Sequence, residues 1–179
     1  MRFRLVTAAV ALVLTAAALS GCTGEPDPAE PTPAFSSEEE AFAAAEETYR
    51  AYVDALNRVD LSDPETFEDV FAWTTGEANA EARETFSQMH ADGWMVGGQS
   101  RAVVVKPMLD VPDWATEVQF AVCLDVSTVT LVDDQNQSVV DESRPEIQSM
   151  LVTLSATPAN STGWAIADFD GREGEPACE

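Results

Sequence analysis

The strongest constraint on the fold is a period of two in the hydrophobicity of residues 117–126. Successive side chains of a β-strand point to opposite faces, so the apolar residues of this run would line one face of a sheet. Two shorter runs further along the chain alternate in the same way. The apolar positions are Val118, Phe120, Val122, Leu124 and Val126, then Met150, Val152 and Leu154, and then Trp164 and Ile166. The pattern predicts an antiparallel sheet in the second half of the chain.

The strands around this run are less sharply defined. Residues 103–105 begin a strand that Pro107 would stop, because proline has no N–H for a β-ladder. The alternation slips at residues 127–128, which indicates either a bulge in one long bent strand or a break between two strands. Residues 133–137 have the composition of a turn, and Val139-Val140 are expected to start a return strand.

Three helices are expected before the strands. Ser37 is a suitable N-cap with Glu40 as its capping-box partner, and a helix of about six turns should follow. Asp63-Pro64 marks a second helix start, and a third helix follows Gly76. The expected apolar faces are Phe42, Ala45, Tyr49, Tyr52, Val53, Leu56 and Val59, then Phe67, Val70 and Phe71, and then Ala78, Ala82, Phe86 and Met89.

This order of elements predicts an α+β fold in which three N-terminal helices pack on a curved, cone-like antiparallel sheet. The long amphipathic first helix, residues 122–127, residues 163–166 and a cysteine near the C-terminus carry a resemblance over roughly Ser36 to Cys178. The chain resembles the nuclear transport factor 2-like cone fold, and more narrowly the small lipoproteins of high-GC Gram-positive bacteria with such a domain. That fold hosts isomerases, cyclases, dehydratases and binding modules, so the resemblance implies no single function.

The first 21 residues have the features of a secretion signal. Arg2 and Arg4 precede an apolar run from Leu5 to Leu19, followed by Ser20 and Gly21. The run fits the h-region of a signal peptide, and it is short for a membrane span, which needs about 20 residues. We therefore expect residues 1–21 to be removed.

Residues 19–22, Leu-Ser-Gly-Cys, resemble the lipobox of bacterial lipoproteins, in which the cysteine receives a diacylglycerol. The resemblance implies that Cys22 becomes a lipidated N-terminus, anchored in the cell membrane at its extracytoplasmic face. The alternative is ordinary cleavage that leaves Cys22 as a thiol or a disulfide partner. Residues 22–35 read as the lipidated cysteine and a proline-rich linker of roughly 35 Å, and residues 36–179 as one domain.

Cysteine usage and charge limit the remaining possibilities. With Cys22 lipidated, Cys123 and Cys178 are an even pair in an oxidising compartment, and we expect one disulfide. After cleavage, seven basic residues would face 32 acidic ones. Such a chain should repel nucleic acid and anionic lipid head groups. The acidity serves either solubility and overall composition or a cationic ligand.

Residues suited to catalysis are few. His90 is the one histidine, and it is either an acid/base partner of Asp92 or a side chain that interacts with carbonyls at a helix end. Residues 168–173 resemble part of a calcium loop but lack a third oxygen residue before Gly171, so a turn is the preferred interpretation. No metal site, cofactor or catalytic residue is assigned on this basis.

Tyr49 and Trp164 lie on faces that should meet, and Asp168 shares the parity of Trp164, so these three side chains are the candidates for lining a cavity. The sequence favours a non-catalytic binding or accessory module at the cell envelope, with an unknown envelope ligand or protein as its partner. Two alternatives remain. One is a small cone-fold enzyme of the isomerase or cyclase type that uses Asp168, and the other is a structural partner in an envelope complex.

Overall fold

Helices occupy the first part of the domain and strands the second, as the periodicity predicts. The computed structural model describes residues 35–109 and 113–178. The predicted signal peptide, Cys22 and the rest of the linker up to residue 34 lie outside the described residues. The helical elements are α1 (Glu38–Leu56), a 3-10 turn η1 (Pro64–Thr66), α2 (Phe67–Phe71) and α3 (Gly76–Ala91).

α1 begins where its N-cap predicts and ends earlier than its apolar pattern predicts. The Ser37 hydroxyl accepts a hydrogen bond from the Glu40 N–H (3.2 Å), which caps the first turn. The Glu40 carboxylate reaches one residue further back than a capping box requires and accepts from the Ser36 N–H (2.9 Å). The helix has 19 residues, so Val59 lies beyond its end.

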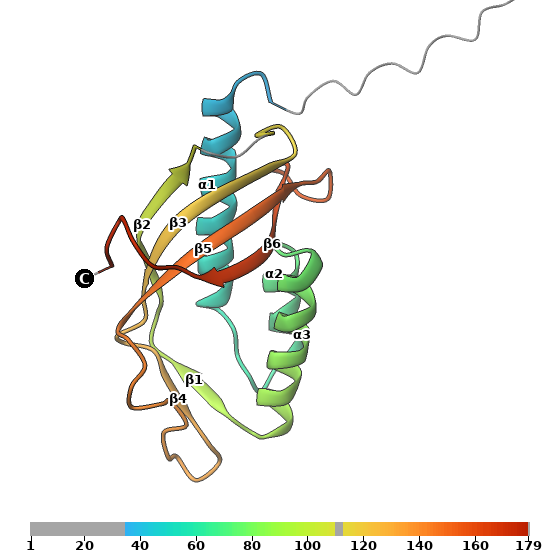
Figure 1. Cartoon of the computed structure of the whole chain (residues 1–179). Coiled ribbons are helices and arrows are strands. Elements are labelled where there is room, and N and C mark those ends of the chain that lie inside the picture. Colours follow the sequence, from blue (N-terminus) through green and yellow to red (C-terminus); the bar gives the residue numbers. More distant parts are fainter. Residues whose placement is uncertain (1–34, 110–112, 179) are drawn as a thin grey trace, which may run out of the picture. The chain divides into compact units, whose positions relative to one another are not determined.

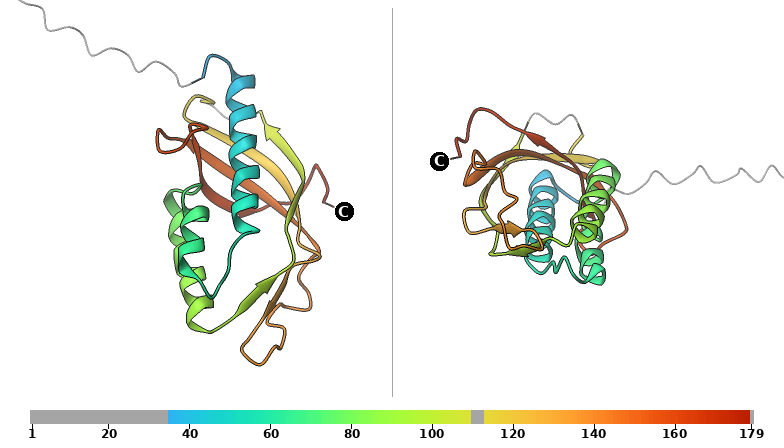
Figure 2. Two further views of the ribbon diagram at one scale, coloured as in Figure 1. Left: turned by 180° about the vertical axis from the view of Figure 1, so that it is seen from behind. Right: turned by 90° about the horizontal axis from the view of Figure 1, so that it is seen from below.

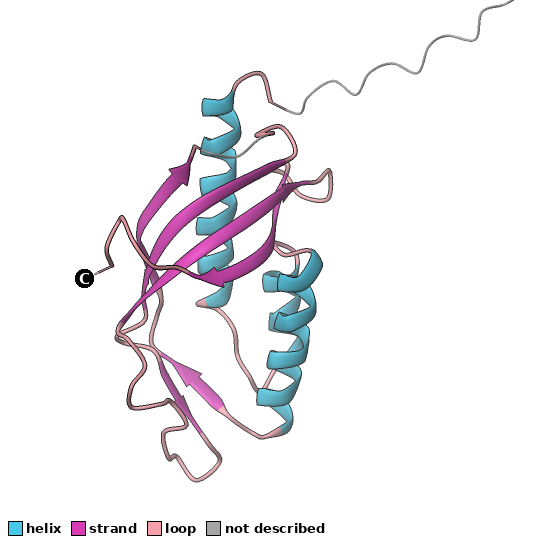
Figure 3. Cartoon of the chain, viewed as in Figure 1, coloured by secondary structure: helices cyan, strands magenta, loops and turns pink. Residues whose placement is uncertain are grey.

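Four antiparallel strands form the main sheet, in the order β2-β3-β5-β6. A separate two-stranded sheet pairs β1 with β4. The main sheet lies alongside α1, and the small sheet extends beyond the end of this helix (Figures 1 and 3). The strands are β1 (Met95–Gly97), β2 (Arg101–Met108), β3 (Glu117–Asp125), β4 (Thr130–Val132), β5 (Ile147–Ala156) and β6 (Trp164–Gly171). This α+β arrangement of three helices and an antiparallel sheet confirms the predicted fold class.

The inner face of the main sheet packs on α1. Figure 2 shows the sheet curving around one side of this helix, with α2 and α3 beside it. Phe42 of α1 meets Phe120 of β3 edge to face, with ring centroids 5.7 Å apart. The inner face is buried at Val118, Val122, Val152, Leu154 and Ile166. The alternation in the sequence therefore predicted the core face of the sheet.

Phe35 belongs to the core of the domain. Its ring stacks on Trp164, with centroids 5.2 Å apart and planes 6° from parallel. Only 8% of Phe35 is exposed. The residue that we expected to end the linker is thus part of the core, and it is the first residue that the structure describes.

The structure changes three expectations about the strands. Pro107 does not stop a strand, because it lies inside β2, which is an edge strand and tolerates a residue without an N–H. The slip at residues 127–128 is a break, since β3 ends at Asp125 and β4 begins at Thr130. Val139-Val140 start no strand, and β4 takes β1 as its strand partner instead.

A second apolar cluster lies between the helices and the small sheet. Leu61, Phe67 and Phe71 are buried in it. Phe86 of α3 stacks on Phe67, with centroids 5.2 Å apart, and Leu131 of β4 packs against the same cluster. The small sheet is thereby tied to α2 and α3 rather than to the main sheet alone.

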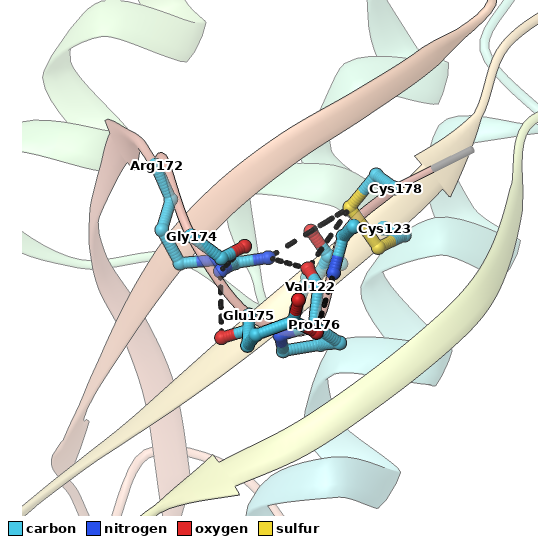
Figure 4. Close-up of a disulfide and its surroundings, with 8 residues drawn as sticks. Val122, Cys123, Arg172, Gly174, Glu175, Pro176 and Cys178 are labelled. Carbon is cyan, nitrogen blue, oxygen red and sulfur yellow. Dashed lines mark hydrogen bonds between the residues drawn. A yellow bond between two sulfur atoms is a disulfide. The ribbon is translucent and has the colours of Figure 1, made fainter.

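The disulfide between Cys123 and Cys178 is confirmed, with Cα atoms 5.4 Å apart. The C-terminal segment folds over the outer face of β3, and the Arg172 guanidinium donates to the carbonyl oxygens of residues 174–176 (Figure 4). Cys123 is 1% exposed although it lies on the outward face of its strand. The C-terminal segment therefore covers a part of the sheet that would otherwise face solvent.

Candidate functional site

Two of the predicted cavity residues lie in the closed core. Tyr49 and Trp164 are both 0% exposed. The Tyr49 hydroxyl and the Trp164 Nε1–H have no hydrogen-bond partner among the described residues. Burial, with a smaller contribution from neighbouring Tyr52, raises the pKa of Tyr49 far above its usual range. Both side chains therefore pack the interior and do not border either hollow described below.

The third predicted residue, Asp168, is turned outward by a register shift in β6. Thr153 of β5 pairs with Asp168, and Leu154 pairs with Ile166, so Ala167 is left without a partner on β5. One extra residue reverses the parity of everything beyond it. Asp168 therefore lies on the outer face with Thr153. The prediction that it points inward like Trp164 and Ile166 is wrong.

Phe169, and not Asp168, points inward on this part of β6. It pairs with Val152, a fully buried residue, and packs against the core. Its ring lies 5.4 Å from that of Tyr52 on α1, between ring centroids. The position facing α1 is thus occupied by an aromatic side chain instead of a carboxylate.

His90 lies in the last turn of α3 and is exposed. Its Nδ1 is 2.7 Å from the carbonyl oxygen of Leu61, so Nδ1 carries the proton and donates it. The imidazole edge also meets the Phe67 ring, with centroids 6.4 Å apart. His90 holds α3 against the segment before η1, and neither His90 nor Asp168 lines either of the two hollows described below.

A cavity of about 290 Å³ lies where the two apolar clusters meet, beyond the C-terminal end of α1. We call it the junction pocket. Eight of its side chains are apolar, and they come from the end of α1 and the following segment, from α3, and from β1 and β4 with their flanks. They are Leu56, Val59, Leu61, Phe86, Met89, Val96, Val129 and Leu131.

Asn57, a polar side chain of the junction pocket, binds the backbone of Ser100, which also lines the pocket. The Asn57 amide donates to the carbonyl oxygen of Ser100 (2.9 Å) and accepts from the Ser100 N–H (2.8 Å). Asn57 is the C-cap of α1, so this pair joins the helix end to the start of β2. The hydrogen-bonding capacity of the Asn57 amide is thereby largely used within the protein.

The third polar side chain is Arg144, from the segment before β5. Its Nη2 donates to the carbonyl oxygens of Val126 (3.2 Å) and Val129 (2.9 Å). These two carbonyls belong to the turn between β3 and β4, so the guanidinium is fixed by backbone. No aspartate or glutamate lines the pocket.

A second hollow, more open and more polar, lies beside the first and shares Asn57 and Ser100 with it. Arg50, Arg58 and Arg101 border it. Arg50 pairs with Glu46 (2.7 Å) and Arg101 with Asp125 (3.0 Å). Most of its positive charge is therefore balanced by neighbouring carboxylates.

Apolar side chains are also exposed at the rim of the junction pocket. Met95 of β1 is 49% exposed and Val96 38% exposed. Successive strand residues face opposite ways, so Val96 lines the pocket while Met95 points away from it. Within residues 35–109 and 113–178, no three His, Cys, Asp or Glu side chains gather closely enough to hold a metal ion. None of the helices in the same ranges is long and apolar enough to cross a membrane.

The sequence did not single out this pocket. Arg144 lies in an irregular segment, and its two carbonyl partners become neighbours only through the break between β3 and β4. The one sequence feature that could have indicated a close backbone contact at this place is the pair Gly97-Gly98. Gly98 has φ +80° and lies directly against the Thr128 carbonyl, a conformation and a contact that no larger residue allows.

Comparison with known proteins gives no family. No family model and no curated protein matches the sequence. Among solved structures, the intermembrane space region of the chloroplast protein ARC6 is 13% identical, with 72% of this chain and 94% of that chain covered and a TM-score of 0.47. VirB8 of Agrobacterium tumefaciens is 13% identical over 82% and 99%, with a TM-score of 0.40. A periplasmic fragment of TraM is 14% identical over 78% and 100%, with a TM-score of 0.38. These likenesses are too distant to carry an argument about function.

Proposed function

We propose that this chain is a lipid-anchored binding module at the extracytoplasmic face of the cell membrane, and that its domain, of the nuclear transport factor 2-like kind, takes an apolar ligand in the junction pocket. The observation that carries this proposal is a cavity of about 290 Å³ with eight apolar side chains and no carboxylate, in a chain of formal net charge −23. Small-molecule sites are mostly apolar hollows with a few fixed polar groups.

The position of the pocket suits a tethered module. The linker would join the domain at Phe35, next to the N-terminal end of α1, while the pocket lies beyond the C-terminal end. With 19 residues at ~1.5 Å each, α1 separates these two places by about 28 Å. A ligand can therefore enter the pocket without passing the segment that leads to the anchor.

The enzymatic alternative lacks its required geometry. A general acid and base must both reach one bound substrate. His90 is committed to the Leu61 carbonyl, and Asp168 lies on the outer face of β6. Neither side chain lines the junction pocket.

Binding of an uncharged apolar probe tests the proposal. We expect octanol to shift the NMR resonances of methyl groups that line the pocket, and Val96→Asp to weaken binding roughly tenfold, because it places an unpaired carboxylate against the ligand. Met95→Asp is the matched control, since it adds the same charge one residue away on the opposite side of β1. Absence of saturable octanol binding, or equal weakening by both variants, would contradict a ligand in the junction pocket.

A further inference from the structure

We infer that the ligand of the junction pocket is an amphiphile with one short apolar chain and an acidic head group, carboxylate or phosphate, and that Arg144 binds the head group. This inference rests on the proposed function and adds the chemical class of the ligand. It follows from the charge of the pocket lining, from the hydrogen bonds of Arg144 and from the size of the cavity.

The lining is unusual in its charge. The chain has 32 acidic residues and nine basic ones, yet no acidic side chain borders the junction pocket and one basic side chain does. Arg144 is half-buried, and the apolar walls shield part of its guanidinium from water. A ligand with a single negative group would therefore meet a matching charge where solvent screens the attraction less than at the open surface.

Arg144 is fixed and still has donors to offer. Its Nη2 is the atom that binds Val126 and Val129, while Nε and Nη1 have no partner among the described residues. A guanidinium has five N–H donors in a rigid planar fork, which matches two oxygens of a carboxylate or phosphate. Because the backbone already holds the group in place, little side-chain entropy is lost when an anion binds.

Four of the other arginines of the domain have partners of their own, whereas Arg58, at the open second hollow, has no side-chain partner among the described residues. Arg50, Arg83 and Arg101 each pair with a carboxylate, at 2.7, 3.4 and 3.0 Å. Arg172 spends its guanidinium on the carbonyls of the C-terminal segment. Arg144 has no carboxylate partner within the described part of the chain although carboxylates are abundant. An unpaired charge beside an apolar wall is costly, and an anionic ligand would offset that cost.

The volume limits the apolar part of the ligand. Sites for drug-sized ligands span about 300–1,000 Å³, and the junction pocket lies at the lower limit of that range. One short alkyl chain fits this space better than a two-chain lipid or a fused ring system. The head group would lie at the Arg144 side, and the chain would contact Leu131, Phe86 and Met89.

Four probes with the same eight-carbon chain test the inference on the unmodified mature protein: octanoate, octyl phosphate, octanol and octylamine. We expect the two acids to bind roughly tenfold more tightly than octanol, since a hydrogen bond to a charged group adds that much, and octylamine to bind most weakly. The overall charge of the chain predicts the reverse order, with the amine preferred. Tighter binding of the acids would therefore reflect the charge of the pocket and not that of the whole chain. Tighter binding of octanoate would point to a fatty acid as the ligand, and tighter binding of octyl phosphate to a phosphate head group.

Arg144→Gln tests the residue. The variant removes the charge and keeps a polar amide, so it should bind octanol as before, and the acids should then bind no more tightly than octanol. Arg58→Gln is the matched control, because it removes the same charge from the neighbouring hollow and should leave the preference intact.

The outcomes separate the two proposals. If octanol binds and the acids bind no better, or if Arg58→Gln removes the preference as fully as Arg144→Gln, this inference is overturned and the apolar pocket stands. If none of the four probes binds, the proposed function fails. If Arg144→Gln does not fold, the order of the four probes on the unmodified protein decides the inference without it.

Discussion

At the scale of single residues, Gly98 shapes the junction pocket. Its backbone has φ +80°, and a Cβ at this position would overlap the carbonyl oxygen of Thr128. The contact brings the segment after β1 against the turn between β3 and β4, which also carries the carbonyls that hold Arg144. One glycine thus keeps two walls of the pocket together.

Gly98→Ala should therefore destabilise the domain more than left-handed backbone strain alone explains. Strain of this kind costs about 1–2 kcal/mol, and the backbone overlap with Thr128 adds to it. Gly174→Ala isolates the strain, since Gly174 has φ +98° and no atom within 4 Å of its added Cβ. Urea denaturation measures both free energies of unfolding, and equal losses would show that the contact with Thr128 yields easily.

Hydrogen bonds from neighbouring residues strongly lower the pKa of Asp125. A hydrogen bond from the Ser127 hydroxyl, then one from the Ser127 N–H, then one from Arg101 lower the pKa of Asp125 to about 2. Because the pKa is lower in the folded protein than the ordinary 3.8, its contribution to stability is present above pH 4 and is lost as the pH falls toward about 2.

NMR titration of the Asp125 carboxyl checks this order of causes. Ser127→Ala should raise the pKa of Asp125 more than Arg101→Gln does, because the hydrogen bond from the hydroxyl is the largest single cause of the lowered pKa. Asp125→Asn should remove the part of the acid unfolding that depends on this group between about pH 4 and 2. A larger rise of the pKa in Arg101→Gln would show that the ion pair dominates instead.

At the scale of elements, the sequence predicted the buried faces of regular helices and strands, but it did not predict the bulge in β6. The strict alternation of β3 and the three-and-four spacing of α1 predicted which faces are buried, because both elements obey one period along their length. β6 does not, since the unpaired Ala167 reverses parity and moves Asp168 outward. A bulge leaves no trace in an alternation of hydrophobicity that is only four residues long.

The candidate site was hidden for a related reason. β1 and β4 have three residues each, too few for a period, and they pair across more than thirty residues of chain. Arg144 becomes a pocket residue only once that pairing exists. The disulfide, in contrast, needed no geometry, because two cysteines remained once Cys22 was assigned to lipid.

The C-terminal segment should contribute strongly to stability through its disulfide. Replacing both Cys123 and Cys178 with alanine releases a loop that spans 55 residues, which costs about 4 kcal/mol in the chain-entropy model. Arg172→Gln keeps the bond and loses the guanidinium contacts in Figure 4, so it should cost less. Thermal unfolding of the oxidised variants measures both, and a larger loss in Arg172→Gln would reverse the assigned order.

At the scale of the whole molecule, the negative charge of the domain and the proposed lipid anchor have opposite effects on attachment to a membrane. After removal of residues 1–21 the chain would keep seven basic residues against 32 acidic ones, so the domain is repelled by anionic head groups. Under the proposed lipidation, attachment would depend on the lipid at Cys22, and each buried CH₂ of an acyl chain would contribute about 0.8 kcal/mol, so that two or more chains would form a stable anchor. In the proposed anchored form, the same repulsion would keep the junction pocket away from an anionic bilayer surface.

Cys22→Ser should therefore release the protein from the membrane without changing its fold. We expect the unmodified protein to partition into the detergent phase and the variant into water, because the acyl chains are the one proposed source of membrane affinity. Thr23→Ser is the matched control, since it alters the neighbouring residue and leaves the cysteine available. The unfolding midpoint and octanol binding of a Cys22→Ser protein that lacks residues 1–21 should match those of the lipidated form. A variant that still partitions with detergent would contradict the lipid anchor, and one that lost octanol binding would show that the anchor takes part in the pocket.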